Sequence, residues 1–172
     1  MIDVRAIGYA TFETPDVERQ VEYYTQVLGL HIEHRDANHA VLVTQTGRQA
    51  VVLDKGSVAR CTKIALQVAP GTAFADVASR LQASEGIQSE RRSDASPGIA
   101  ETLQLVDPIG TTVELFSEAR LARKREQTAI GPMKLGHIAF SCADVKQQTE
   151  FYCRVLGLTR TTRSSSATPS ST

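Results

Sequence analysis

Apolar positions in the first 116 residues follow strand and helix periods in the same order twice. In the first unit, a short apolar run at residues 4–12 predicts a strand. The helix after it has apolar residues at steps of four, three and four, namely Val17, Val21, Tyr24 and Leu28. Thr14 is expected to cap this helix, and Gly29 to end it in a left-handed conformation. Three strands are predicted to follow at residues 31–35, 40–44 and 49–53.

The second unit repeats this order with different residues. A strand is predicted at 63–68, and a helix with apolar residues from Phe74 to Leu81 ends at Gly86. A weaker strand at 87–91 and a polar loop at 93–98 follow, and then two strands at 102–106 and 111–116. Each β-α-β-β-β unit has one apolar sheet face, so the two units are expected to pack together or to join edges.

The start of the first unit returns near the end of the chain. Residues 8–30 align without a gap with residues 136–158, which lie 128 positions later. The identities include Gly8/Gly136, Phe12/Phe140, Asp16/Asp144, Gln20/Gln148, Tyr24/Tyr152 and Val-Leu-Gly-Leu at 27–30 and 155–158. One difference changes the chemistry, because Tyr9 of the first copy is His137 in the second.

This third unit is predicted to contain only a strand and a helix, joined to the second unit by a charged helix or linker at residues 117–131. The expected helix face consists of Val145, Thr149, Tyr152 and Leu156. Residues 159–172 are almost entirely Ser and Thr, so they are predicted to be disordered.

Composition excludes several functional classes. The 172 residues carry 19 basic and 19 acidic side chains, which predicts no nucleic-acid partner. The basic run at residues 120–125 is interpreted as a solvated helix face or linker. No signal peptide or membrane-spanning run is recognised, so no membrane partner is expected. Three cysteines without C-x-x-C spacing favour reduced thiols in a cytoplasmic protein.

Three motifs together carry a family resemblance. They are Gly-His-Ile-Ala-Phe at 136–140, Phe-Tyr-x-x-Val-Leu-Gly-Leu at 151–158 and Asp-Pro-x-Gly-x-x-x-Glu-Leu at 107–115. The chain resembles the vicinal-oxygen-chelate superfamily, which includes glyoxalase I, bleomycin-resistance proteins and type I extradiol ring-cleavage dioxygenases. It is most similar to the N-terminal part of such a dioxygenase. The resemblance implies an α+β fold in which paired β-α-β-β-β modules form a cup-shaped half-barrel, plus a partial third module.

The resemblance also implies where metal ligands would lie. Extradiol dioxygenases hold Fe(II) with two His and one Glu in their second domain, a set that leaves coordination positions open. In the first domain these positions fall on Tyr9, Lys63 and Glu114. A protonated Lys has no lone pair, so this domain is expected to be metal-free, with Lys63 and Glu114 as a buried ion pair. In the second domain His137 matches one metal ligand, and its two partners would lie in a fourth unit.

The resemblance predicts a first domain at residues 1–130, the start of a second at 131–158 and a disordered tail at 159–172. The first function hypothesis is an extradiol dioxygenase of aromatic catabolism by descent, inactive as this truncated chain and without bound Fe(II). The alternative is a metal-independent small-molecule binding module of the glyoxalase/bleomycin-resistance type, whose cup would hold a small apolar or planar molecule. Tyr9 and Glu114 would point into this cup, and the partner implied by either hypothesis is a small aromatic substrate or ligand. A third is a truncated product without a function.

Two further features could be interpreted functionally. His31, His34 and His39 invite a metal hypothesis, but His31 and His34 differ by an odd number on a predicted strand and face opposite sides, which favours surface histidines. The partial third unit is expected to expose an unpaired strand edge and the helix face of Val145, Tyr152 and Leu156. Such a surface predicts swapped homo-oligomers, and deletion of residues 132–172 is expected to leave folding intact.

Overall fold

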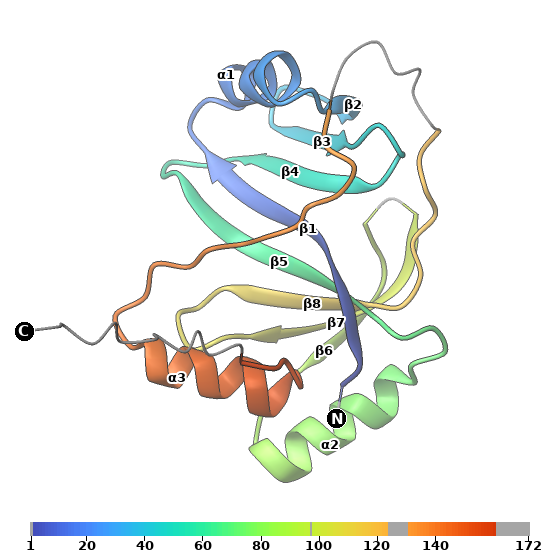
Figure 1. The fold of residues 1–172 in the computed structure, drawn as a ribbon, viewed down its shortest axis with the longest axis vertical. Coiled ribbons are helices and arrows are strands. Elements are labelled where there is room, and N and C mark those ends of the chain that lie inside the picture. The colour runs from blue at the N-terminus through green and yellow to red at the C-terminus, as the bar shows by residue number, and fades with distance from the viewer. Residues whose placement is uncertain (1, 97, 124–130, 161–172) are drawn as a thin grey trace, which may run out of the picture.

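A computed structural model describes residues 2–96, 98–123 and 131–160 of the chain. These residues form eight strands in one open mixed sheet, in the order β2-β3-β4-β1-β5-β8-β7-β6. The strands are β1 (Val4–Thr14), β2 (His31–Arg35), β3 (His39–Val43), β4 (Gln49–Lys55), β5 (Arg60–Val68), β6 (Glu90–Ser96), β7 (Ile99–Val106) and β8 (Thr112–Phe116). The predicted α+β half-barrel built from two β-α-β-β-β modules is confirmed (Figure 1).

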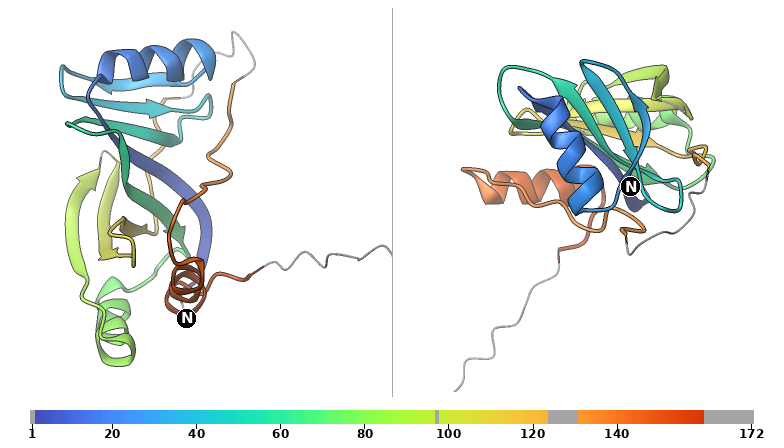
Figure 2. Two further views of the ribbon diagram at one scale, coloured as in Figure 1. Left: turned by 90° about the vertical axis from the view of Figure 1, so that its left-hand side faces the viewer. Right: turned by 90° about the horizontal axis from the view of Figure 1, so that it is seen from above.

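Each module contains one helix, and a third helix follows the second module. These are α1 (Val17–Glu22), α2 (Phe74–Glu85) and α3 (Val145–Glu150), and α1 and α3 continue as the short π-helices η1 (Tyr23–Val27) and η2 (Phe151–Val155). Figure 2 shows α1 at one end of the molecule and α2 and α3 at the other. Within the described residues, no helix combines the length and the apolar character needed to cross a membrane.

The two modules join through their first strands. β1 pairs with β5 in antiparallel orientation, and β5 runs parallel to β8. On its other edge β1 runs parallel to β4, but this ladder begins only at the pair Ala10 and Val51. The earlier residues of β1 therefore have no ladder partner from β4, and the sheet divides there.

The hairpin of β6 and β7 differs from the sequence-based prediction. A polar loop was expected at residues 93–98, but β6 extends to Ser96 and β7 begins at Ile99. β6 is an edge strand, where polar and charged side chains can point into solvent on both faces. The Arg91 guanidinium donates to the Glu101 carboxylate across the hairpin, so charge pairing compensates for the lack of apolar alternation.

The sequence repeat is visible in the helix ends. α1 and α3 begin at equivalent positions, and each is capped by an aspartate, Asp16 or Asp144, whose carboxylate accepts a backbone N–H of the first turn. Gly29 and Gly157 both have positive φ, 72° and 74°, as a left-handed helix end requires. The prediction that Thr14 caps the first helix is wrong, because its hydroxyl accepts from the N–H of Asp16 before the helix begins.

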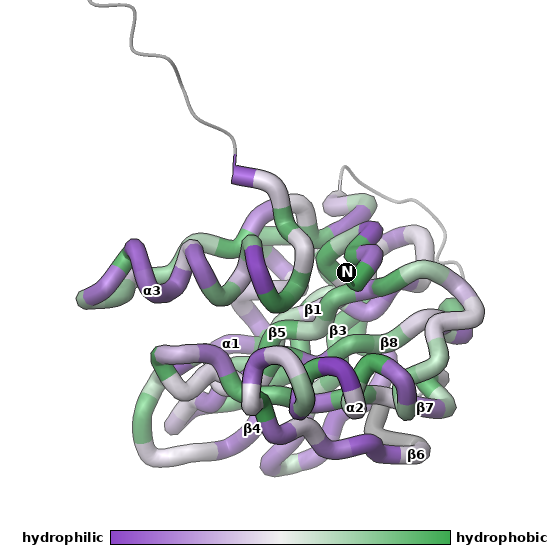
Figure 3. Tube along the Cα trace, turned by 90° about the horizontal axis from the view of Figure 1, so that it is seen from below, coloured by the Kyte–Doolittle hydropathy of each residue, from purple (hydrophilic) through white to green (hydrophobic). Residues whose placement is uncertain are grey.

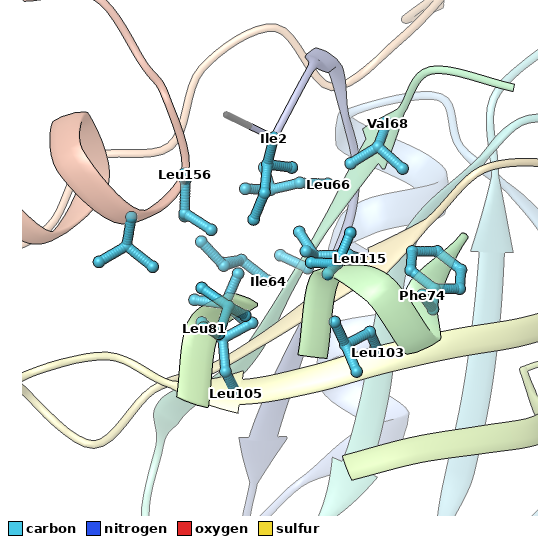
Figure 4. Close-up of a cluster of buried hydrophobic side chains, with 14 residues drawn as sticks. Ile2, Ile64, Leu66, Val68, Phe74, Leu81, Leu103, Leu105, Leu115 and Leu156 are labelled. Atoms are coloured by element: carbon cyan, nitrogen blue, oxygen red, sulfur yellow. The ribbon is translucent and has the colours of Figure 1, made fainter. Parts of the chain in front are cut away.

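The third helix packs into the largest core of the protein. This cluster lies between α2, the central strands and η2 (Figure 4). Its buried members include Ile2, Ile64, Leu66, Phe74, Leu81, Leu103, Leu115, Val155 and Leu156. Leu156 is completely buried, and Figure 3 shows hydrophilic and hydrophobic positions alternating along α3. The expectation of an exposed helix face is therefore wrong for Tyr152 and Leu156, because the core of the second module covers them. Val145, the third residue of that face, is exposed as expected.

A buried carboxylate also ties the third helix to the second module. Asp107, at the turn between β7 and β8, accepts the backbone N–H of Thr111 with one oxygen at 2.8 Å. Its other oxygen accepts the amide of Gln148 at 2.6 Å and the hydroxyl of Tyr152 at 3.2 Å. Asp107, Pro108 and Gly110 belong to one of the three motifs that carry the resemblance, and here the Asp links the turn to α3 and η2.

The partly buried phenol of Tyr152 should make the free energy of unfolding depend on pH. Burial, and then the negative charge of Asp107, raise the pKa of its phenol above the ordinary value of 10.0. The folded protein holds this proton more tightly than the unfolded chain, so the stabilisation is present below about pH 10 and is lost as the pH rises further. Tyr152→Phe should reduce the fall in the free energy of unfolding above about pH 10, measured by denaturant titration. Burial also raises the pKa of Tyr24, so some dependence of the free energy of unfolding on pH should remain in the variant. A variant whose stability falls with pH as steeply as that of the original chain would contradict the prediction.

The strand predicted near the third helix does not form. Residues 131–143 have no ladder partner and cross the sheet as an irregular segment (Figure 1). In the first copy the equivalent strand β1 pairs with β4 and β5, whereas the described part of the third unit contains no such neighbours. Residues 117–123 of the predicted charged helix or linker form no helix, which agrees with the linker alternative. Its residues 124–130 lie outside the described chain, and so does the predicted disorder from residue 161 onward.

Candidate functional site

The inner face of the sheet carries a buried carboxylate with three donors. Glu114 on β8 is completely buried. One carboxylate oxygen accepts the hydroxyl of Tyr9 from β1. The other accepts the ammonium of Lys63 from β5 at 3.1 Å and the amide of Gln104 from β7 at 2.6 Å. The structure thus brings together all three positions that the resemblance assigned to the first-domain site, and adds Gln104.

Strand pairing explains why these side chains meet. Gln104 lies directly opposite Glu114 in the antiparallel ladder between β7 and β8. Lys63 pairs with Thr112 in the parallel ladder between β5 and β8. Thr112 and Glu114 are two positions apart, so Lys63 and Glu114 project from the same sheet face. Gln104 could be found from sequence only once the β7–β8 register was known.

The charge of the buried carboxylate is compensated within the cluster. A buried carboxylate is strongly destabilising unless it is paired and hydrogen-bonded. Lys63 supplies the opposite charge, and its side chain is 24% exposed, so the ammonium keeps some hydration. The predicted ion pair of Lys63 and Glu114 is confirmed. With both oxygens engaged, Glu114 is held in one orientation.

The donor set of this cluster does not fit Fe(II). A ferrous site of this class needs two neutral imidazoles and a carboxylate with a free lone pair. Here a phenol and an ammonium stand where the resemblance places the imidazoles, and the two Glu114 oxygens together accept three hydrogen bonds. The chemistry available to the cluster is hydrogen bonding and charge pairing within the cup.

His137 lies apart from this cluster. Its side chain is exposed on the irregular segment that follows Gly136. Across the described residues, no three His, Cys, Asp or Glu side chains are close enough together to hold a metal ion. The three clustered histidines of the first module are also at the surface, and His39 is held by Asp54 at 2.6 Å. The role of His137 as a metal ligand stays a prediction.

A cavity of about 240 Å³ lies beside the cluster, where β1 and β4 separate. Tyr9 belongs to both, and its ring lies 6.3 Å from the ring of Phe116, which also lines the cavity. Ala6, Ile7 and Gly8 form one wall. Gly8 is required there, because a Cβ atom would lie 2.4 Å from the Phe116 ring.

The segment after β8 closes this cavity. The N–H of Arg120 donates to the carbonyl of Gly98 at 2.7 Å, and the N–H of Ala122 donates to that of Gly47 at 2.9 Å. These two glycines belong to the turns of the two modules' hairpins. Residues 119–121 therefore cross from one module to the other and form part of the cavity lining.

Solved structures similar to this chain are ring-cleaving dioxygenases. A variant of homoprotocatechuate 2,3-dioxygenase from B. fuscum matches at 28% identity with a TM-score of 0.74, covering 91% of this chain and 45% of that one. A second variant of that enzyme matches at 30% identity and a TM-score of 0.61, covering 72% and 35%. The 2,3-dioxygenase LapB from Pseudomonas sp. KL28 shares the fold at 20% identity and a TM-score of 0.78, covering 91% and 60%.

These matches confirm the resemblance to type I extradiol dioxygenases of the vicinal-oxygen-chelate superfamily. The similarity at 28% identity supports descent from that family. The chain spans less than two thirds of the length of each of these dioxygenases. No protein-family model and no curated protein matches it.

Proposed function

We propose that this chain is the metal-free, non-catalytic part of an extradiol-dioxygenase-type protein. In this proposal residues 1–130 form a domain whose former metal position is filled by a hydrogen-bonded ion pair, and residues 131–158 begin a second domain. The observation that supports it is the engagement of both Glu114 oxygens by Tyr9, Lys63 and Gln104. Such a cluster stabilises the sheet and offers no coordination position to a catechol and O2.

Anaerobic reconstitution with Fe(II) tests this proposal. We expect far less than one iron per chain after desalting, and no oxygen uptake with simple catechols. One iron per chain together with ring cleavage would overturn it. In that case another set of ligands would have to hold the metal, for example His137 together with side chains from a second copy of the chain.

A matched variant restores the ligand types that the cluster lacks. Tyr9→His together with Lys63→His places two imidazoles beside Glu114, the donor set that suits Fe(II) and Co(II). We expect this variant to bind one Co(II) per chain, detected by visible absorption, while the original chain does not. Adding Glu114→Gln should abolish the signal. Equal Co(II) binding by the original chain and the double variant would contradict the assignment of this position.

A further inference from the structure

The cavity between β1 and β4 combines an apolar wall with unpaired positive charge. Arg48, Arg120 and Lys134 all contribute to its lining, and they come from three separate segments. No acidic residue lines it among those that the structure describes. The ion pairs found in the described chain involve none of these three side chains. Over the described ranges, the cavity lining therefore combines three cationic residues with no acidic one.

This arrangement favours an anion electrostatically. Three cationic residues around one cavity of about 240 Å³ give it a positive potential, which added salt weakens. Arg side chains bind carboxylates through two parallel N–H donors, so they suit a planar anionic group. Glu33 lines the adjoining cavity, which shares Arg120 but not Arg48 or Lys134. An anion in the first cavity would thus lie among lining residues that include three cationic side chains and no carboxylate.

The remaining lining favours an aromatic body. The rings of Tyr9 and Phe116 are tilted by 32° and both are buried, with Ile99 beside them. Leu121 and Leu135 complete the apolar lining. Rings of this kind accept another ring in a tilted or offset arrangement. The cavity is smaller than typical drug-sized pockets, which restricts the ligand to one or two rings.

One polar group at the cavity has no hydrogen-bond partner in the part of the chain that the structure describes. The side-chain nitrogen of Gln49 is buried and has no hydrogen-bond acceptor among the described residues. A buried donor left without an acceptor is destabilising, so a ligand oxygen that accepts from it would add affinity. By contrast, the amide of Gln67, also in the lining, already donates to the carbonyl of Ser117.

We propose that this cavity is a binding site for a small aromatic carboxylate, held by Arg48, Arg120 and Lys134 with its ring against Tyr9 and Phe116. The site needs neither a metal nor His137. It therefore goes beyond the proposed absence of catalysis, and the iron-binding experiment does not decide it. Closure by residues 119–121, which are bonded to both hairpins, would make ligand binding a link between the two modules.

Calorimetric titration of the full chain with 2-naphthoate tests the proposal, with the uncharged 2-naphthamide as the matched ligand. We expect the carboxylate to bind at least about tenfold more tightly, the range given by charge-assisted hydrogen bonds. Raising the salt concentration should weaken the binding of 2-naphthoate and leave the binding of 2-naphthamide nearly unchanged. Equal affinity of the two ligands, or no binding of 2-naphthoate, would overturn the proposal.

Two variants locate the site. Arg48→Gln with Arg120→Gln should weaken 2-naphthoate binding at least about tenfold. Both side chains are exposed, so folding is expected to survive and is checked by circular dichroism. Arg92→Gln is the matched control, because this exposed arginine pairs with Glu90 on the edge strand β6. Unchanged affinity in the double variant, or an equal loss in the control, would place binding elsewhere and overturn the proposal.

Discussion

Leu156→Ala should lower the free energy of unfolding by about 2–5 kcal/mol, as expected for a fully buried leucine whose truncation leaves a cavity. Leu156 is 0% exposed and packs among Ile2, Ile64, Leu66 and Leu81. Those residues belong to the first 130 positions, so the loss would measure how strongly the third helix stabilises the first two modules. Urea or guanidinium titration gives the value directly.

The internal repeat supplies a matched control for this substitution. Leu28 occupies the equivalent position of the first copy, but it is 41% exposed. Leu28→Ala should therefore change stability by less than about 1 kcal/mol. A similar effect of both substitutions would mean that the third helix does not pack as described.

The packing of the third helix also implies that deletion of residues 132–172 uncovers core side chains and the Asp107 carboxylate. The deleted chain should therefore aggregate or unfold, contrary to the sequence-based expectation.

The contrast between Leu28 and Leu156 also shows what sequence periodicity can and cannot predict. The spacing of apolar residues predicted both helices, because this feature is local. They could not predict that the same motif position is exposed in one copy and buried in the other. That outcome depends on which surface lies opposite, and here α3 and η2 meet the second module through Asp107, Gln148 and Tyr152.

The candidate sites were predicted to different degrees for the same reason. Family resemblance located Tyr9, Lys63 and Glu114, and the structure brings them together. Gln104 was missed because its role depends on strand register. Arg120 was interpreted as part of a solvated charged run, and only the bonds of residues 119–122 to the two hairpin turns bring it to the cavity.

Lys63→Met should lower the free energy of unfolding by about 2–4 kcal/mol at neutral pH. The substitution keeps the length of the side chain but removes the charge that compensates the Glu114 carboxylate. Removing one partner of a buried pair typically costs about 3–5 kcal/mol. A smaller value is expected here, because the Lys63 side chain is 24% exposed and Tyr9 and Gln104 continue to donate to the carboxylate.

A second substitution separates charge compensation from packing. In Lys63→Met with Glu114→Gln, no buried charge remains, and the amide of Gln104 can turn to present its oxygen. We expect the double variant to recover at least about half of the stability that the single variant loses. Lys146→Met removes an exposed pair with Glu150 and should change stability by less than about 1 kcal/mol. If the effects of the two cluster substitutions simply add, then Lys63 acts through packing alone, and the ion pair is not what stabilises the cluster.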